Sequence, residues 1–224
     1  MNQLGLPITL DSKMLLENLV GNQQILDFIN QLYFQDRSAE IYVYGETGKG
    51  KTHLLQGTIS RALAKKKNGM YIDCNEPMPE HVIDYIDQLD WIGIDNINQI
   101  DSQQQHLFFD LYNRAKLSEI SIIVSGPTAP SSLSIMKDLK TRLGLATVFE
   151  LEELNDDLTK EVLKNQMNER NLTIETKVYE YLFKHYSRNV NILISAINLL
   201  DRASLQSKQG ITIPFVKKHD LKGL

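Results

Sequence analysis

The residues with the clearest chemical capacity form a glycine-rich stretch that matches G-x-x-x-x-G-K-[ST] without a mismatch. Its glycines let the backbone curl so that several N–H groups point at phosphate oxygens, and the positive N-terminal end of a following helix adds to the attraction. The pattern therefore predicts a phosphate-binding loop. Its residues are Gly45, Glu46, Thr47, Gly48, Lys49, Gly50, Lys51 and Thr52.

Two side chains at the end of this loop would contact the ligand directly. Lys51 can reach the β- and γ-phosphates, and the hydroxyl of Thr52 can ligate Mg²⁺. An apolar strand-like run precedes the loop and a helical pattern follows it, which favours a site over a glycine-rich turn without a ligand. We predict that the chain binds ADP or ATP with Mg²⁺. His53 is next on the same helix and is placed in the site by position, with packing as its alternative role.

A second acidic element follows at a strand end, where the apolar run Trp91–Ile94 leads into Asp95. A carboxylate there can hold the water shell of Mg²⁺ together with Thr52. An aspartate that ends a strand is also a common turn residue. The next residue is Asn96, whose amide can orient a water molecule but cannot accept its proton at neutral pH. We therefore expect slow intrinsic hydrolysis.

The elements that must position these residues alternate along the chain. Strands are expected at 41–44, 70–72, 91–94, 120–124 and 147–149, with helices around 25–32, from the loop to about 63, at 80–86 and at 102–117. Strands separated by helices predict an α/β fold with a parallel sheet covered on both faces. After Leu151 the spacing of apolar residues predicts three helices. We divide the chain into a flexible arm (1–10), an α/β domain (11–154) and a three-helix domain (155–224).

Composition narrows the function classes. Among 224 residues, 42% are hydrophobic and 23% are charged, which excludes disordered and fibrous classes. The net charge of −4 argues against an unassisted DNA binder, since phosphate neutralisation needs a basic surplus. The single cysteine, Cys74, permits no internal disulfide and is expected to be a buried thiol. With no signal peptide pattern and no apolar run of about 18 residues, we expect a cytoplasmic protein and no membrane contact.

With the loop, Asp95 and the helical C-terminal part in hand, the chain resembles AAA+ ATPases of the DnaA group, and among them the regulatory inactivators of the initiator DnaA. The resemblance covers nearly the whole chain. It implies a P-loop AAA+ parallel sheet with helices on both faces, followed by a small all-α lid domain. The strings that carry it are Ile94–Ile97, Phe109–Arg114, Leu199–Ser204 and Ile211–Lys217.

The resemblance gives the N-terminal arm a role. It resembles the peptide with which such proteins dock on the sliding clamp, the beta subunit of DNA polymerase III. A flexible arm can place a glutamine amide for hydrogen bonding and two leucines in apolar pockets. The alternative is an exposed or folded-back terminus. The residues concerned are Gln3, Leu4, Gly5, Leu6 and Pro7.

The resemblance also implies an arginine finger at Arg142, which is presented to the nucleotide of a neighbouring subunit. A guanidinium there stabilises charge on the γ-phosphate in the transition state. From the residues alone, an ion pair with Asp138 is the alternative. Val20 and Gly21 resemble a segment that lines the adenine pocket through backbone groups.

The chain departs from the family at the nucleotide sensors. Where the family carries a lid arginine, this chain has Asn191, and Arg188 lies nearly one helical turn earlier as a substitute. Sensing through the lid is therefore in doubt, and Ser125 makes a weak first sensor. Nucleotide binding itself is still expected, because the Gly-Lys-Thr ending of the loop is intact.

The resemblance implies a nucleotide-binding regulator that docks on the clamp and stimulates hydrolysis of DnaA-bound ATP, with weak or no ATPase activity of its own. The alternatives are a self-acting ATPase of the helicase-loader type and a non-catalytic clamp adaptor. The resemblance to DnaA stops before a DNA-binding domain, so we expect no direct specific DNA binding. The sequence leaves open the preference for ADP or ATP and the oligomeric state, a homodimer included.

Overall fold

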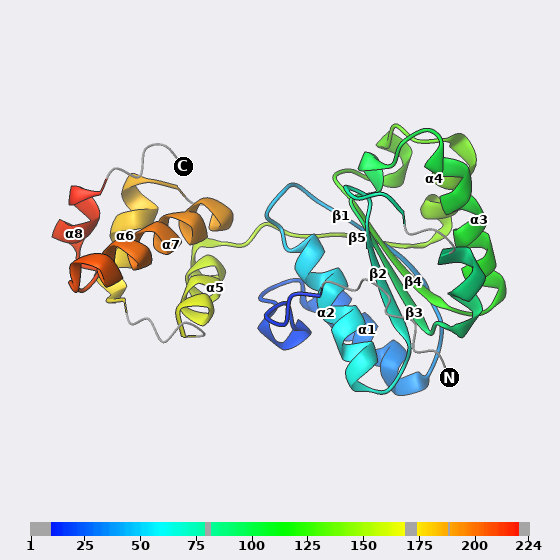
Figure 1. Ribbon diagram of the computed structural model, residues 1–224, viewed down its shortest axis with the longest axis horizontal. Helices are drawn as coiled ribbons and strands as arrows, with labels where there is room; N and C mark the ends of the chain where they lie inside the picture. Colours follow the sequence, from blue (N-terminus) through cyan, green and yellow to red (C-terminus); the bar gives the residue numbers. More distant parts are fainter. Residues whose placement is uncertain (1–9, 79–81, 169–173, 188, 220–224) are drawn as a thin grey trace. The chain divides into compact units, whose positions relative to one another are not determined.

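The computed structural model describes residues 10–78, 82–168, 174–187 and 189–219 (Figure 1). The chain divides into two compact units, Met1–Glu152 and Glu153–Leu224. Each unit has its own hydrophobic core, and each is described by itself.

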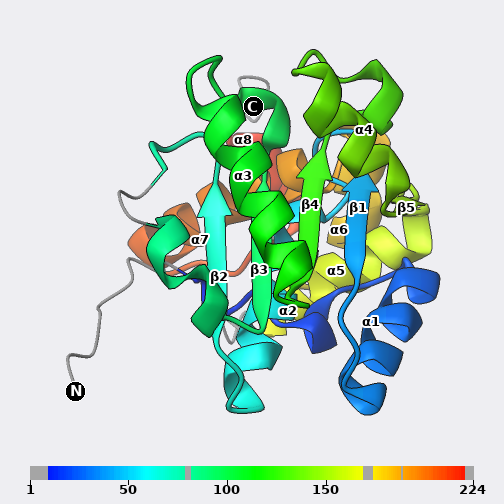
Figure 2. The same ribbon diagram turned by 90° about the vertical axis from the view of Figure 1, so that its right-hand side faces the viewer.

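The first unit is built on a five-stranded sheet of order β2-β3-β4-β1-β5. All its strand pairs are parallel, and the carboxyl ends of β1, β3 and β4 meet at one edge of the sheet (Figure 2). The prediction of an α/β fold with a parallel sheet is confirmed. The strands are β1 (Glu40–Tyr44), β2 (Gly69–Asp73), β3 (Trp91–Asp95), β4 (Ser121–Gly126) and β5 (Thr147–Glu150).

Helices cover both faces of this sheet. α1 (Gln23–Gln35) and α2 (Lys51–Ala64) lie on one face, and α3 (Gln104–Leu117) and α4 (Lys137–Leu145) lie on the other (Figure 1). Because side chains alternate along a strand, Tyr42 packs in the core under α3 and α4, whereas its neighbours Ile41 and Val43 pack under α1 and α2. The two cores fix α2 and α4 on opposite sides of the sheet.

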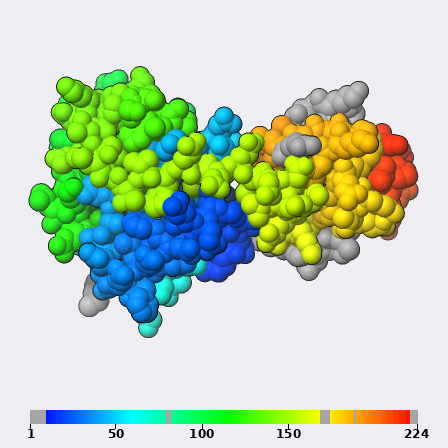
Figure 3. Space-filling view, turned by 180° about the vertical axis from the view of Figure 1, so that it is seen from behind, coloured from blue at the N-terminus to red at the C-terminus, as the bar shows by residue number. Residues whose placement is uncertain are grey.

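Short 3₁₀ helices complete this unit at Leu16–Asn18, Val82–Gln88, Ile97–Gln99 and Pro130–Ser132. The helix predicted at 80–86 is thus a 3₁₀ helix, and residues 79–81 lie outside the described part. α1 packs beside β5, which is an outer strand of the sheet. The ring centroids of Phe28 and Phe149 are 5.4 Å apart there, and Figure 3 shows the surfaces of the two elements together.

Residues 10–19 lie along the outer side of α2. Asp11 N donates to Gln56 Oε1 at 2.9 Å, and Arg61 forms an ion pair with Glu17 at 2.5 Å. A Cβ atom on Gly57 would lie 2.8 Å from Leu16 N, so glycine is needed for the close approach of segment and helix. The segment after the arm is therefore attached to the helix that follows the phosphate loop.

The second unit contains four described helices, α5 (Asp156–Asn168), α6 (Thr176–His185), α7 (Val190–Ser207) and α8 (Ile213–Lys218). The sequence predicted three helices, and α8 is a fourth that the apolar pattern did not indicate. This helix is six residues long, too short to show a repeat of apolar residues. It begins where Thr212 Oγ1 accepts from Phe215 N and where Pro214 occupies the first turn. No described helix is both long and apolar enough to cross a bilayer.

Candidate nucleotide-binding site

The phosphate loop joins the end of β1 to the start of α2. Gly48 and Gly50 have φ values of +93° and +86°, in the left-handed region that favours glycine. Gly50 is the N-cap of α2, so the curled backbone leads directly into the positive end of a 14-residue helix. The structure thus gives the loop the local geometry that phosphate binding requires.

Lys51 lies on the inner side of this loop. Its Nζ donates to the carbonyl oxygens of Gly45 at 2.6 Å and of Glu46 at 2.9 Å. Burial lowers the pKa of the Lys51 ammonium, while the negative charge of Asp95 acts in the opposite direction. Lys51 and Asp95 are therefore near neighbours, at the edge of the sheet where the loop begins.

Asp95 ends β3 and is fully buried. Its Oδ1 accepts hydrogen bonds from the hydroxyl of Ser125 and from the backbone N–H of Asn96, the latter at 3.1 Å. Its Oδ2 accepts from the hydroxyl of Tyr71 at 2.8 Å. A buried carboxylate with these partners differs from the alternative of an exposed turn aspartate.

Asn96 has a left-handed backbone (φ +56°), a conformation that asparagine tolerates better than most residues. Its Nδ2 donates to Asp73 Oδ1 at 2.9 Å, so the amide nitrogen faces β2 and Oδ1 is left as its acceptor. Asp73 is a site residue that sequence reasoning missed. A signal existed, because β2 also ends in an aspartate, but only the register Asp73↔Asp95 brings the two strand ends together.

Replacing Asn96 by a carboxylate tests this contact. Asn96→Asp puts two carboxyls side by side, and we expect about 1 kcal/mol lower stability at pH 8 in this partly exposed place. Asp73 raises the pKa of the new carboxyl in the folded state, so the deficit is present above that pKa. It fades as the pH falls from about 6 to about 4, because a protonated carboxyl can donate to Asp73 again.

Denaturant unfolding at pH 8 and at about pH 4 measures this difference in stability. Asn96→Ala is the matched control, since it removes the donor without adding charge and should cost the same at every pH. A deficit in Asn96→Asp that does not change with pH would contradict the contact with Asp73.

The donors at the sheet edge suit magnesium held with a nucleotide. Thr52 and Asp95 are the residues that could supply oxygen ligands, and Mg²⁺ is usually bound by one or two protein oxygens, phosphates and several waters. Within the described ranges there is no cluster of three or more His, Cys, Asp or Glu residues that would form an all-protein cage. The residues present therefore fit a metal that arrives with phosphate.

Three other predicted site residues are placed as follows. Val20 and Gly21 follow Leu19, whose Cδ1 lies 3.2 Å from the position of a Cβ on Gly50, so this segment runs beside the phosphate loop. His53 Nε2 lies 2.8 Å from the carbonyl oxygen of Leu15. The His53 side chain thus holds the segment that runs along α2, which is the packing role, and its contact with nucleotide stays a prediction.

Of the predicted lid residues, Asn191 lies within the described part of the chain. Asn191 is in the first turn of α7, in the second unit, where its backbone N–H donates to Asn189 Oδ1 at 2.9 Å. Arg188 and the arm residues Gln3–Pro7 lie outside the described residues.

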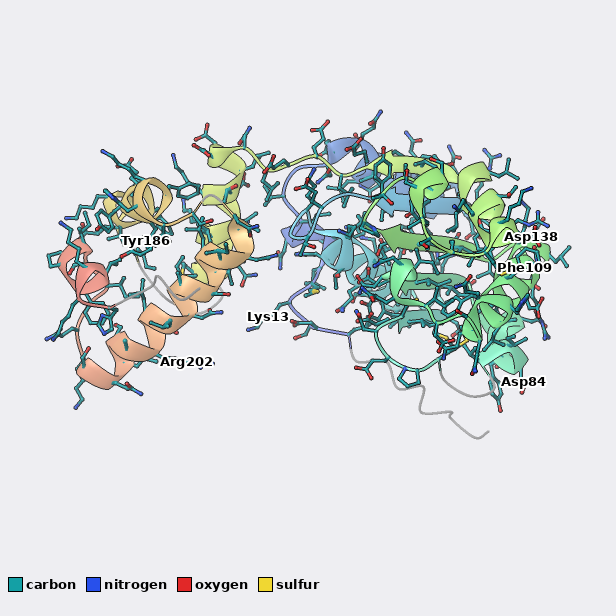
Figure 4. The ribbon with its side chains drawn as sticks, turned by 90° about the horizontal axis from the view of Figure 1, so that it is seen from above. Lys13, Asp84, Phe109, Asp138, Tyr186 and Arg202 are labelled. Carbon is teal, nitrogen blue, oxygen red and sulfur yellow. The ribbon has the colours of Figure 1, made fainter. Side chains whose placement is uncertain are left out.

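Arg142 is in α4, on the face of the sheet opposite α2. Its guanidinium carbon lies 5.9 Å from the ring centroid of Phe109 in α3, and the side chain is partly exposed. Figure 4 shows Phe109 and Asp138 on the same side of the α/β unit. None of the ion pairs found within the described ranges joins Arg142 to Asp138. Among the residues that the structure describes, the Arg142 guanidinium forms no hydrogen bond or ion pair, and its charge lies over the ring of Phe109.

Two family models match this chain, and a bacterial protein is similar to it over nearly its whole length. The model of the bacterial DnaA ATPase domain matches residues 29–150, and that of the Hda lid domain matches residues 156–219. An uncharacterized protein of Haemophilus influenzae is 30% identical over 224 residues, which cover 96% of this chain and 97% of that protein.

Solved structures show a similar fold. Domain III of the replication initiation protein DnaA from Thermotoga maritima has a TM-score of 0.83 at 20% identity, covering 92% of this chain and 95% of that one. AMPPCP-bound DnaA from Aquifex aeolicus has a TM-score of 0.73 at 24% identity, covering 86% of this chain and 66% of that one. The AAA+ fold and the lid that follows it are thus shared with DnaA.

Proposed function

Since this chain belongs to the bacterial DnaA ATPase-domain family and continues into a lid domain of the Hda type, we propose that it is a nucleotide-binding regulator of replication initiation. It acts on DnaA and stimulates hydrolysis of the ATP that DnaA holds. The observation that carries this proposal is that the α/β unit has two separate sites with different features. The first is an intact phosphate loop without a proton acceptor at position 96. The second is Arg142, in a helix on the opposite face of the sheet from α2.

The chain's own site binds ADP or ATP with Mg²⁺. The loop amides and Lys51 face the phosphates, and Thr52 and Asp95 hold the metal, which supplies charge neutralisation when it is bound. The AMPPCP complex of Aquifex aeolicus DnaA supports an adenine nucleotide as the ligand. The backbone of Val20 and Gly21 lines the adenine side, and Asn191 or Arg188 supplies the lid contact.

Lys51→Ala should weaken ADP binding by about 30-fold or more, because a charge-assisted hydrogen bond to phosphate contributes about 2 kcal/mol. Titration of a fluorescent ADP derivative measures the loss. Lys49→Ala is the matched control: it removes the same charge from the same loop, at a position where the motif accepts any residue. Equal losses in the two variants would mean that Lys51 has no special contact with phosphate.

Hydrolysis in the chain's own site is slow. Asn96 cannot take the proton of an attacking water, and its amide nitrogen is held by Asp73 at 2.9 Å. The chemistry therefore takes place in the nucleotide pocket of DnaA, where this chain supplies a positive charge.

Arg142 is the source of that charge. α4 and α2 pack on opposite faces of the sheet, so the helix that carries Arg142 is separated by the sheet from the helix that follows the phosphate loop of its own chain (Figure 1). Its planar guanidinium suits bidentate contact with a γ-phosphate in a neighbouring subunit.

The arm determines where the chain acts. Gln3, Leu4 and Leu6 dock on the sliding clamp, which keeps the regulator on replicated DNA in the cytoplasm. The contact of Asp11 with Gln56 holds the residue that follows the arm on α2. Recruitment by the clamp accounts for action at DNA by a chain with a net charge of −4.

A reconstituted hydrolysis assay tests the proposal. DnaA loaded with labelled ATP is mixed with the full chain, ADP and clamp assembled on nicked DNA, and labelled ADP is measured. We expect faster hydrolysis that requires the chain, the clamp and residues 3–7. Clamp binding without acceleration would identify an adaptor, and rapid turnover by the chain alone would identify a self-acting ATPase; either result rejects the regulator.

A further inference from the structure

Tyr71 holds the metal-binding carboxylate from the neighbouring strand. It lies in β2, one strand away from Asp95, and its hydroxyl donates to Asp95 Oδ2 at 2.8 Å. The register of β2 against β3 therefore brings a hydroxyl donor to the buried carboxylate.

The direction of this bond follows from the two groups. A carboxylate oxygen accepts, so the Tyr71 hydroxyl is the donor. Burial is the main cause that raises the pKa of Tyr71, and the charge of Asp95 raises it further. The hydroxyl therefore stays protonated and remains a donor.

The protein takes up most of the accepting capacity of Asp95. A carboxylate has about four lone-pair positions. Ser125 and the backbone of Asn96 fill those of Oδ1, and Tyr71 fills one on Oδ2. Since Asp95 is 0% exposed, bulk water does not compete for the remainder. Water bound to a magnesium ion must share Oδ2 with Tyr71.

We propose that Tyr71 is a positioning residue that limits how much Mg²⁺ strengthens nucleotide binding. The inference rests on the proposed nucleotide site and adds a property to it. Asp95 is already satisfied without the metal, so its hydrogen bonds change little when Mg²⁺ arrives with the nucleotide. The chain then retains ADP with a weak dependence on Mg²⁺.

The test measures the Kd for a fluorescent ADP derivative in EDTA and divides it by the Kd at saturating MgCl₂. Tyr71→Phe should raise this ratio about tenfold, as expected when one hydrogen bond to a charged acceptor is lost and the metal-bound water replaces it. Tyr33→Phe is the matched control: its hydroxyl donates to Thr58 O at 2.7 Å, with no connection to Asp95. An unchanged ratio in Tyr71→Phe overturns the proposal.

Tyr71→Phe keeps the ring and removes one oxygen atom, so we expect the variant to fold, and thermal unfolding checks this. If the wild-type chain binds no ADP in either buffer, the nucleotide site itself is wrong, whereas binding with equal ratios in all variants rejects only the role of Tyr71.

Discussion

Arg142→Ala should reduce the stimulated hydrolysis of DnaA-bound ATP by about 10³-fold, the effect expected when a guanidinium is removed from a phosphoryl-transfer transition state. Folding should be nearly unaffected, because Arg142 is partly exposed and its described contact is with the face of Phe109. Binding to the clamp should also be retained, since the arm residues are separate from α4. Labelled ADP release in the reconstituted assay measures the loss.

Two further substitutions separate the finger from a general loss of charge. Arg142→Lys keeps the positive charge but loses the planar fork, and should recover only a small part of the stimulation. Lys137→Ala removes an exposed cation from the first turn of the same helix and should leave stimulation within about twofold of wild type, as weak surface electrostatics requires. Stimulation that survives in Arg142→Ala would place the catalytic charge elsewhere.

The centre of the sheet was predictable from the sequence because its strands are mostly apolar. β3 and β4 are buried on both faces and appear as short continuous runs, Trp91–Ile94 and Ile120–Val124, between helical patterns. The phosphate loop was predictable for a related reason, since its geometry depends on glycines at fixed spacing. Local rules were sufficient in both cases.

The residues that surround Asp95 and Asn96 were not predictable in the same way. Tyr71 and Asp73 belong to a strand whose register against β3 is decided by packing of the whole sheet. Gln56 is a polar residue in an otherwise apolar stretch of α2, and only the approach of β2 and of Asp11 shows why it is buried. These contacts are long-range, and one sequence carries no direct signal for them.

The family could be predicted from short sequence strings, even where the contacts of those residues could not. The strings around Asp95, in α3 and in α7 indicated the DnaA group, and the family models for residues 29–150 and 156–219 confirm that assignment. The lid was less well predicted, since α8 is too short for a periodic pattern and depends on Thr212 and Pro214 at its start.

Gly126→Ala should destabilise the chain by about 3 kcal/mol, near the upper end for overpacking in a core. For a protein of this size that is a fall in Tm of roughly 6–12 °C. A Cβ atom at position 126 would overlap the hydroxyl oxygen of Tyr42, which is fully buried and donates to Thr128 O at 2.8 Å. Tyr42 packs in the core under α3 and α4 and cannot turn aside, so β4 itself must shift.

Tyr42→Phe should rescue this variant, because it removes the atom that overlaps and leaves Cζ, 3.1 Å from the new Cβ, as the nearest contact. Tyr42→Phe alone should cost about 1 kcal/mol for the lost hydrogen bond. In its background Gly126→Ala should cost about 1 kcal/mol, a coupling of about 2 kcal/mol that a double-mutant cycle by denaturant unfolding can measure. Because Ser125 precedes Gly126 and donates to Asp95, ADP affinity should fall in the single variant and recover in the double variant. Additive losses would mean that the Tyr42 hydroxyl is not what requires glycine at the end of β4.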